Sequence, residues 1–293
     1  MTIADEFEAH RPRLFGLAYR MLGSADEAED TVQDAYLRFD AAERTEIEYP
    51  GAWLAKVVTN LCLTRLTSAR VRREEYVGTW LPEPVITADG TLGPFESAEQ
   101  RDAVSMAMLV LLERLTPTER AVYVLREAFS YGHREIAGVL DLTEANCRQL
   151  YRRAAQRVGE PGSRFDAAPE RQAELVTSFI TAARDGDLSG LEKVLAADAT
   201  WWGDGGGRVN AARRPIEGRE KVVRLLVGMA DRWTTGLSFT PAEVNGAEGL
   251  VAWAGGELVG VMAFEVRDGL IGDVRAVVNP EKLGFVRGQL AGV

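Results

Sequence analysis

Apolar residues in the first 75 positions recur at the spacing of helices. One helix face is formed by residues at i, i+1, i+4, i+7 and i+8: Leu14, Phe15, Ala18, Met21 and Leu22. Gly23 is suited to end this helix, and Ser24 with Glu27 three residues later is a capping pattern for the next one. The pattern then continues as far as Arg73, which predicts an all-α domain over residues 1–75.

Residues 76–96 break this periodicity. They contain three Pro and three Gly, which predicts an extended linker. Trp80 and Leu81 are unusual in a passive spacer, because spacers normally avoid large apolar groups. We therefore expect this linker to dock on another part of the protein.

A second all-α domain is predicted over residues 97–159. Thr116, Pro117 and Glu119 form a strong helix start, and from Tyr131 to Val158 the pattern is helix, short turn, helix. The last of these helices has one inner stripe, at Cys147, Tyr151, Ala154 and Val158. Its polar residues Arg148, Gln149, Arg152 and Arg153 are therefore expected to point outward.

After a second linker at 160–169 the pattern changes from helical to mixed. Two helices near 170–184 and 187–196, a strand near 200–202 and a helix near 217–232 come first. Alternating strands follow near 237–245, 249–255, 257–267 and 270–278, with turns between them. Helices followed by an antiparallel meander predict an α+β domain over residues 170–293. The expected fold class is multidomain, with two all-α domains followed by an α+β domain.

The charge distribution bears on the partners. The net charge is −10, which argues against a protein that binds DNA unaided, because phosphate contacts require Lys and Arg. Residues 1–50 have a net charge of −7, whereas 51–80 have +3 and 148–157 hold four Arg and no acidic residue. An acidic block followed by basic segments is typical of a protein that uses one surface for a protein partner and another for DNA.

The composition argues against disulfides, metal sites and membrane spans. Cys62 and Cys147 fit small apolar positions within helices, and the two Cys and two His have no metal-ligand spacing. We expect no disulfide, metal, cofactor or catalytic residue. There is no long apolar run and no apolar signal core at the N-terminus, so we expect a cytoplasmic protein without a membrane span.

Two segments are candidates for DNA contact. The helix-turn-helix can enter the major groove and present these side chains: Glu144, Asn146, Arg148, Gln149, Arg152 and Arg153. The segment near 53–73 can capture a separated strand, with aromatic stacking and Arg on the backbone, through Trp53, Lys56, Asn60, Arg65, Arg70, Arg72 and Arg73. The alternatives are an ordinary helical hairpin, and a core Trp53 with solvated Arg side chains.

The order of these parts resembles a known family. DEAEDTVQDAYLRF (26–39), PGAWLAKVVTNLCLTRLTSARVRRE (50–74) and the segment 115–158 that begins LTPTERAVYVLRE are similar to the extracytoplasmic-function (ECF) sigma factors of the sigma-70 superfamily. The resemblance covers about residues 5–158. It implies that residues 1–75 are sigma region 2 and that residues 97–159 are region 4.

The resemblance also implies roles for the candidate residues. Asp30, Gln33, Asp34 and Leu37 would bind the clamp helices of the largest subunit of core RNA polymerase. Residues 50–74 would recognise the −10 promoter element, and the helix-turn-helix would read the −35 element. Polymerase binding would supply much of the affinity for promoter DNA, which explains how an acidic chain can act there.

Three further motifs resemble a SigJ-type subgroup with a fused SnoaL-like domain of the nuclear transport factor 2 type. They are Trp80, Leu81, Pro82, Glu83 and Pro84 in the linker; Asp204, Gly205, Gly206, Gly207 and Arg208; and Asn279, Pro280, Glu281, Lys282 and Leu283. Glu281 stands where the subgroup usually has Asp. The resemblance implies an interdomain regulatory role for these residues and no dedicated anti-sigma factor.

The role of the C-terminal domain has two interpretations. It can regulate by docking its glycine loop, residues 204–208, on the linker residues 80–84. It can instead be a small-molecule sensor or enzyme, with a pocket lined by Trp201, Trp202, Trp233, Trp253, Met262 and Phe264 and with Asp204, Asp273 and Arg275 as its polar groups. A third interpretation of the whole chain is a helix-turn-helix regulator that binds DNA without polymerase.

Overall fold

The computed structural model describes residues 2–43, 47–88, 90, 92, 103–159, 168–234 and 236–291, and within these only the backbone of 68–72, 74, 169 and 231–234. The described residues divide into two compact units. Met1–Glu75 and Asp89–Pro161 belong to the first, and Tyr76–Ala88 and Gly162–Val293 to the second. The segment at 76–88 therefore groups with the C-terminal domain.

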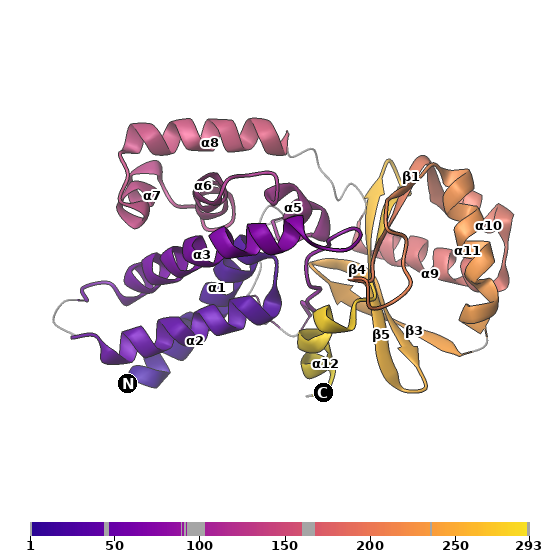
Figure 1. The fold of residues 1–293 in the computed structure, drawn as a ribbon, viewed down its shortest axis with the longest axis horizontal. Coiled ribbons are helices and arrows are strands. Elements are labelled where there is room, and N and C mark those ends of the chain that lie inside the picture. Colours follow the sequence, from indigo (N-terminus) through magenta and orange to yellow (C-terminus); the bar gives the residue numbers. More distant parts are fainter. Residues whose placement is uncertain are drawn as a thin grey trace. The chain divides into compact units, whose positions relative to one another are not determined.

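Three helices form the N-terminal part of the first unit: α1 (Ile3–Leu22), α2 (Ala25–Ala41) and α3 (Pro50–Glu74) (Figure 1). Gly23 ends α1 in the left-handed conformation that its sequence position predicts, at φ 67°. The Ser24 hydroxyl caps α2 by accepting a hydrogen bond from the Glu27 N–H, at 3.1 Å. The predicted helical segment from Trp53 to Arg73 lies within one continuous helix, α3.

The remaining helices of this unit are α5 (Met106–Leu112), α6 (Pro117–Glu127), α7 (His133–Leu140) and α8 (Glu144–Val158). The predicted capping box at Thr116 and Glu119 is present in full at the start of α6. Thr143 caps α8, and the predicted inner stripe of α8 is buried except for Tyr151, which is half-buried. Helices α7 and α8 thus form the predicted helix-turn-helix.

A buried arginine joins the two helical parts of this unit. Arg120 of α6 is 2% exposed and donates hydrogen bonds to the backbone carbonyls of Leu112, at 2.9 Å, and Met21, at 2.8 Å. It also pairs with Glu113 at 2.8 Å, and Glu113 pairs in turn with Arg73 of α3. The first two predicted domains are therefore in direct contact within one compact unit.

The second unit is built on a six-stranded sheet with the order β2-β1-β6-β5-β4-β3. Its strands are β1 (Leu195–Asp204), β2 (Ile216–Glu217), β3 (Leu237–Val244), β4 (Ala247–Ala254), β5 (Glu257–Arg267) and β6 (Leu270–Val277). Strand β1 runs parallel to β6, and the other neighbours are antiparallel. The predicted meander corresponds to β3–β6, while the two-residue strand β2 was not predicted.

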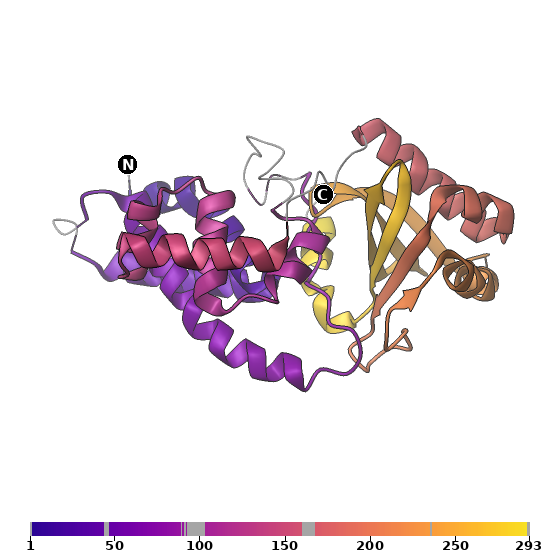
Figure 2. The ribbon, with the colours of Figure 1, turned by 90° about the horizontal axis from the view of Figure 1, so that it is seen from above.

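One face of this sheet is covered by α9 (Pro169–Asp185), α10 (Leu188–Val194) and α11 (Arg219–Thr234), as Figures 1 and 2 show. Paired strand residues face these helices in a row, with Trp201 beside Val274 and Val274 beside Phe264. Phe179 of α9 is fully buried and meets the Phe264 ring edge-on, with 5.2 Å between the centroids. This α+β architecture confirms the predicted fold class.

The C-terminal end adds two elements that periodicity did not indicate, η2 (Pro280–Lys282) and α12 (Gly284–Ala291). Cys62 and Cys147 are both buried, and neither forms a disulfide in this structure. Among the described residues, no helix has the length and apolar character needed to cross a membrane, and no cluster of His, Cys, Asp or Glu is suited to a metal ion.

Phe179→Ala is expected to lower the free energy of unfolding of the C-terminal domain by about 3–5 kcal/mol, because it leaves a cavity between α9 and the sheet. Denaturant unfolding followed by tryptophan fluorescence measures this change. Ser178→Ala, at the neighbouring exposed position of the same helix, is the control. A loss for Phe179→Ala no larger than that of the control would contradict the core assignment.

Candidate functional site

A buried carboxylate at the end of β1 is the centre of the candidate site. Asp204 is 0% exposed, and both of its oxygens accept hydrogen bonds. Oδ1 accepts from the Tyr76 hydroxyl at 2.5 Å and from the Gly206 N–H at 3.1 Å. Oδ2 accepts from the Leu81 N–H at 2.8 Å and from Lys282 Nζ at 2.7 Å. Two of these four donors come from the segment at 76–88.

Lys282 of η2 supplies the positive charge that compensates Asp204. Its side chain is largely buried, and Nζ also donates to the Leu81 carbonyl. The ammonium lies 4.6 Å from the Tyr76 ring centroid and 4.4 Å from that of Trp80, which is the arrangement of a cation–π pair on two rings. The large aromatic residue that is unusual in a spacer thus has a defined partner.

Asn279 connects the end of β6 to the same cluster. Because β1 and β6 are parallel, with Asp204 opposite Val277, their C-terminal ends lie side by side. The Asn279 amide donates to the Tyr76 hydroxyl at 2.9 Å, and its Oδ1 accepts from the Glu281 N–H at 3.1 Å. Burial and the hydrogen bond to Asp204 raise the pKa of the Tyr76 phenol above its usual value, so Tyr76 remains a neutral donor at physiological pH.

The three consecutive glycines are required by close approach of neighbouring groups. A Cβ on Gly205 would overlap the Val209 carbonyl oxygen, and one on Gly206 would overlap the Asn279 side-chain amide. A Cβ on Gly207 would lie 3.2 Å from the Val77 side chain. Gly206 and Gly207 also have positive φ angles, 57° and 71°. The glycine loop therefore lets residues 76–78 lie directly against the end of β1.

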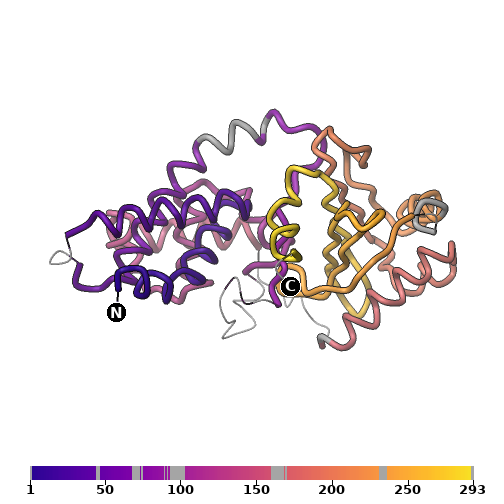
Figure 3. The backbone as a smooth tube through the Cα atoms, turned by 90° about the horizontal axis from the view of Figure 1, so that it is seen from below, coloured from indigo at the N-terminus to yellow at the C-terminus, as the bar shows by residue number. Residues whose placement is uncertain are grey.

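The remaining part of the segment docks along the turn between β3 and β4. Val85 donates to the Asn245 side chain at 3.2 Å and accepts from the Asn245 N–H at 2.9 Å. The Thr87 N–H donates to the Glu243 carbonyl. The side-chain amide of Gln289 in α12 accepts from the Ile86 N–H and donates to the Ile86 carbonyl. Figure 3 shows the purple stretch after α3 beside the orange segment that follows β1.

The structure thus brings together the three motifs that sequence reasoning singled out. Leu81, Pro82 and Pro84 are buried, and Glu83 is half-buried. Arg208 is exposed and pairs with Glu281 at 2.8 Å. Pro280 is exposed and Leu283 is buried.

The polar residues of α8 that the inner stripe predicted to point outward are exposed. Asn146 and four basic or amide residues are exposed: Arg148, Gln149, Arg152 and Arg153. Glu144 is half-buried and pairs with Arg148 one turn later.

Burial acts to raise the pKa of Glu119 in α6, but hydrogen bonds from Thr116 and the charges of Arg157 and Arg153 lower it overall.

The candidate residues of α3 do not share one environment. Asn60 is exposed. Lys56 is half-buried, and its ammonium donates a hydrogen bond to the Asp141 carboxylate in the turn of the helix-turn-helix. Trp53 packs on Phe39 with 5.9 Å between ring centroids. Arg65 pairs with Asp34 at 2.7 Å.

Arg73 is mostly buried against Glu113 and the Leu22 carbonyl. This environment fits a structural arginine better than a DNA contact. The side chains of Arg70 and Arg72 lie outside the described residues.

The candidate polymerase-binding residues lie along α2. Asp30 and Gln33 are exposed, and Leu37 is 58% exposed. Asp34 is half-buried because it holds Arg65.

The candidate enzyme pocket of the C-terminal domain is not assembled. Trp201, Met262 and Phe264 belong to the core under the helices. Alternation along the strands points Trp202, Asp273 and Arg275 to the opposite face, where Trp202 donates to Asp273 at 3.0 Å and Arg275 pairs with Asp273 and Glu265. Trp253 donates to Thr240, and the Trp233 side chain lies outside the described residues. The proposed polar groups and apolar lining therefore do not form one site.

Sequence reasoning missed several residues of the docked segment. Tyr76, Asn245 and Gln289 carry hydrogen bonds that hold residues 76–88. Tyr76 lies directly after the basic end of α3, and its aromatic character before a Pro-rich stretch is a signal that was available. The partners Asn245 and Gln289 have no local signal, because only the fold brings them to the segment.

Comparison with known proteins follows the same division of the chain. Family models match as "Sigma-70 region 2" over residues 7–72 and "Sigma-70, region 4" over residues 105–158. The chain is 38% identical over 291 residues to the ECF RNA polymerase sigma factor SigJ of Mycobacterium tuberculosis, covering 95% of this chain and 92% of that one. It is 30% identical over 293 residues to the probable ECF RNA polymerase sigma factor SigI of the same species, covering 99% and 98%.

A solved structure matches over nearly the whole length. The crystal structure of the M. tuberculosis sigma factor SigJ superimposes with a TM-score of 0.76 at 33% identity, covering 96% of this chain and 98% of that one.

Gly206→Ala is expected to loosen the docked segment, because the new Cβ overlaps the Asn279 amide at a left-handed position. Gly255 has nearly the same φ, 58°, and no atom within 4 Å of an added Cβ, so Gly255→Ala is a control for backbone strain alone. We expect amide hydrogen exchange at Leu81 to be about tenfold or more faster in Gly206→Ala than in Gly255→Ala, which corresponds to about 1.4 kcal/mol. Equal exchange in the two variants would show that the glycine loop does not hold the segment.

Proposed function

Because the chain belongs to the extracytoplasmic-function sigma factors of RNA polymerase, we propose that residues 170–293 regulate promoter recognition in cis by holding the segment at 76–88. Sigma factors of this family act with core RNA polymerase and promoter DNA to start transcription. In this chain the segment leads from the −10-recognising region 2 towards the −35-recognising region 4. A domain that holds it sets how freely those two regions can take the spacing that a promoter requires.

The buried network at Asp204 is the observation that carries this proposal. Its carboxylate has no solvent access, and Tyr76 and Leu81 supply two of its four donors. Releasing the segment would break both of these hydrogen bonds together with the contacts of the Lys282 ammonium with the Tyr76 and Trp80 rings. Docking therefore behaves as a defined state with its own free energy.

The promoter-reading residues are proposed on the basis of their environment. Arg148, Gln149 and Arg152 are exposed on the capped helix α8 and suit bases and phosphates of the −35 element. In region 2, among the candidates whose side chains the structure describes, Lys56 and Asn60 are the accessible ones for the −10 element.

Leu37 on α2 is the proposed apolar contact with the polymerase clamp helices, flanked by Asp30 and Gln33. The exposed side chain of Leu37 is available to a protein partner.

We propose a regulatory rather than a catalytic role for the C-terminal domain. The polar side chains that an active site would need are already bonded to structural partners, Asp204 to the docked segment and Asp273 to Arg275 and Trp202. Control from within the chain also requires no separate anti-sigma factor.

Run-off transcription with core polymerase tests the proposal directly. The full-length protein is compared with a truncation after about residue 165, which frees the segment at 76–88. We expect promoter output to differ between the two proteins by severalfold, and Gly206→Ala to shift output in the same direction as the truncation while Gly255→Ala does not. Identical promoter activity of the full-length and truncated proteins would rule the proposal out.

Gln149→Ala is expected to reduce discrimination at the −35 element by about 1–3 kcal/mol, the typical contribution of a good base contact. The matched control is Gln156→Ala, at an exposed position two turns further along the same helix, because base contacts come from the first turns of a recognition helix. Run-off transcription on promoters with single −35 substitutions measures the difference. Equal effects of the two variants would argue against Gln149 as a base contact.

A further inference from the structure

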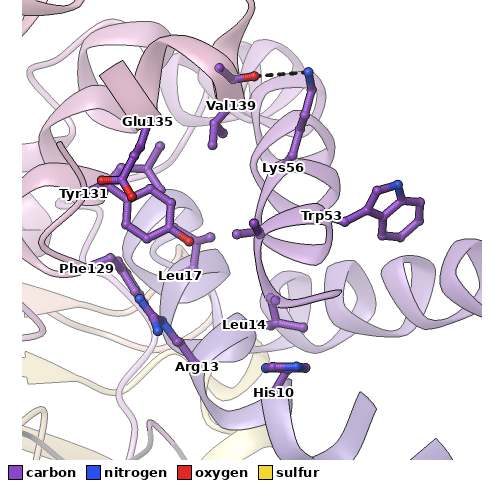
Figure 4. Close-up of a pocket in the computed structure, with 15 residues that line it drawn as sticks. His10, Arg13, Leu14, Leu17, Trp53, Lys56, Phe129, Tyr131, Glu135 and Val139 are labelled. Atoms are coloured by element: carbon purple, nitrogen blue, oxygen red, sulfur yellow. Dashed lines mark hydrogen bonds between the residues drawn. The ribbon is translucent and has the colours of Figure 1, made fainter. Parts of the chain in front are cut away.

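The turn of the helix-turn-helix makes a direct contact with region 2 inside the first unit. The Lys56 ammonium on α3 lies 2.7 Å from the Asp141 carboxylate and 3.2 Å from the Gly138 carbonyl oxygen. Figure 4 shows Lys56 reaching from α3 to the backbone near Val139. One of the two accessible candidates for the −10 element is therefore occupied by region 4 of the same chain.

We propose that this contact is an autoinhibitory latch, in which Asp141 occupies Lys56 and favours a closed arrangement of regions 2 and 4. In the closed arrangement Lys56 cannot bind a phosphate of the −10 strand, so promoter DNA and Asp141 compete for the same ammonium group. The latch is separate from the docked segment at 76–88. It rests on the proposed −10 role of Lys56, and the experiments below separate the two.

The choice of residue in the turn supports a role for its charge. Asp141 ends α7 in the left-handed conformation, with φ 53° and ψ 44°. Gly and Asn meet this requirement at least as well as Asp. The negative charge is thus not needed for the turn itself, and it forms an ion pair with Lys56 across the contact.

A second pair of contacts lies on the other side of the same interface. The Arg13 guanidinium of α1 lies 5.6 Å from the Phe129 ring centroid and 5.8 Å from that of Tyr131, both in the loop between α6 and α7. In Figure 4 these three side chains lie together, across the cavity from Lys56. Arg20 of α1 also lies 5.6 Å from the Phe129 ring centroid, so cationic side chains of region 2 contact region 4 on both sides of the cavity.

Between these contacts lies a cavity of about 600 Å³, which is lined by Leu14 and Leu17 of region 2 and by Leu125 and Val139 of region 4. A cavity loses the dispersion contacts that packed side chains would supply there. The contact of Lys56 with Asp141 at its rim adds to the buried hydrogen bond of Arg120 with the Met21 carbonyl, which also joins the two regions.

The latch is weak enough to be released. The side chains of Lys56 and Asp141 are 39% and 74% exposed, so solvent and salt screen the pair. An exposed pair of this kind shifts an equilibrium by about two- to fivefold. A contact of that strength biases the free protein towards closure and yields to polymerase and promoter DNA.

Asp141→Asn tests the latch with little change to the turn, because Asn also tolerates the left-handed conformation. The matched control is Asp268→Asn, which removes the same charge from another exposed left-handed Asp, with φ 51°. The readout is binding of the free protein to a fluorescent single-stranded oligonucleotide that carries the −10 element, at low salt. We expect about two- to fivefold tighter binding for Asp141→Asn and no change for Asp268→Asn. Equal binding by all three proteins, or equal gains in both variants, would overturn the latch.

Lys56→Ala distinguishes failure of the latch from failure of the −10 assignment. If Lys56 binds the −10 strand, this variant binds the oligonucleotide more weakly than the parent protein. Unchanged binding would remove Lys56 from the −10 site and with it the competition that the latch requires.

Crosslinking tests closure without using Lys56 as a DNA contact. Cys is introduced at both positions, Lys56→Cys and Asp141→Cys, and joined by a short bis-maleimide. The native Cys62 and Cys147 are buried, and burial raises the pKa of both thiols, so they react poorly. We expect efficient intramolecular crosslinking, and run-off transcription by the crosslinked protein at least severalfold below that of the uncrosslinked double variant, whose own output is already lowered by the loss of Lys56. Absence of the crosslink, or equal output of the crosslinked and uncrosslinked double variant, would overturn the proposal.

Discussion

The C-terminal unit depends on a single buried carboxylate. Asp204 ends β1, which lies between β2 and β6 in the sheet, and it has no contact with solvent. A buried charge is tolerated only where its acceptor positions are filled and an opposite charge is near. Lys282 provides the charge, and the segment at 76–88 provides two of the hydrogen bonds. The same requirement that stabilises the domain therefore fixes residues that lie more than 120 positions earlier in the chain.

This dependence has a consequence for the linker. A Pro- and Gly-rich spacer between two DNA-binding regions would ordinarily sample many conformations. Here its first half follows one path, from the Asp204 cluster to the β3–β4 turn, where Val85 and Thr87 bond the domain's backbone. The segment at 76–88 thus has a defined position on the C-terminal domain, and under the proposed regulation the domain acts through this segment without having to touch DNA.

Sequence reasoning found the elements whose signals are local. Caps at Ser24, Thr116 and Thr143, and the strand alternation of residues 237–277, predict structure because neighbouring residues determine it. The order of motifs also identified the family, which the match to whole-length sigma factors confirms. The contacts of Arg73 with Glu113 and of Gln289 with Ile86 had no such signal, since they join residues that only the tertiary fold makes neighbours.

Some of the acidic residues of the chain form ion pairs with cations of region 2. Arg65 faces Asp34, Arg73 faces Glu113, and Lys56 faces Asp141. Lys56, Arg65 and Arg73 are the cations of region 2 that the sequence assigned to DNA and whose side chains the structure describes. Each of them pairs with a carboxylate of its own chain. For Lys56, the proposed −10 contact, binding promoter DNA means exchanging an internal carboxylate for a phosphate. We propose that core polymerase, by binding α2, also acts on the ion pair of Arg65, because Asp34 of α2 is the carboxylate in that pair.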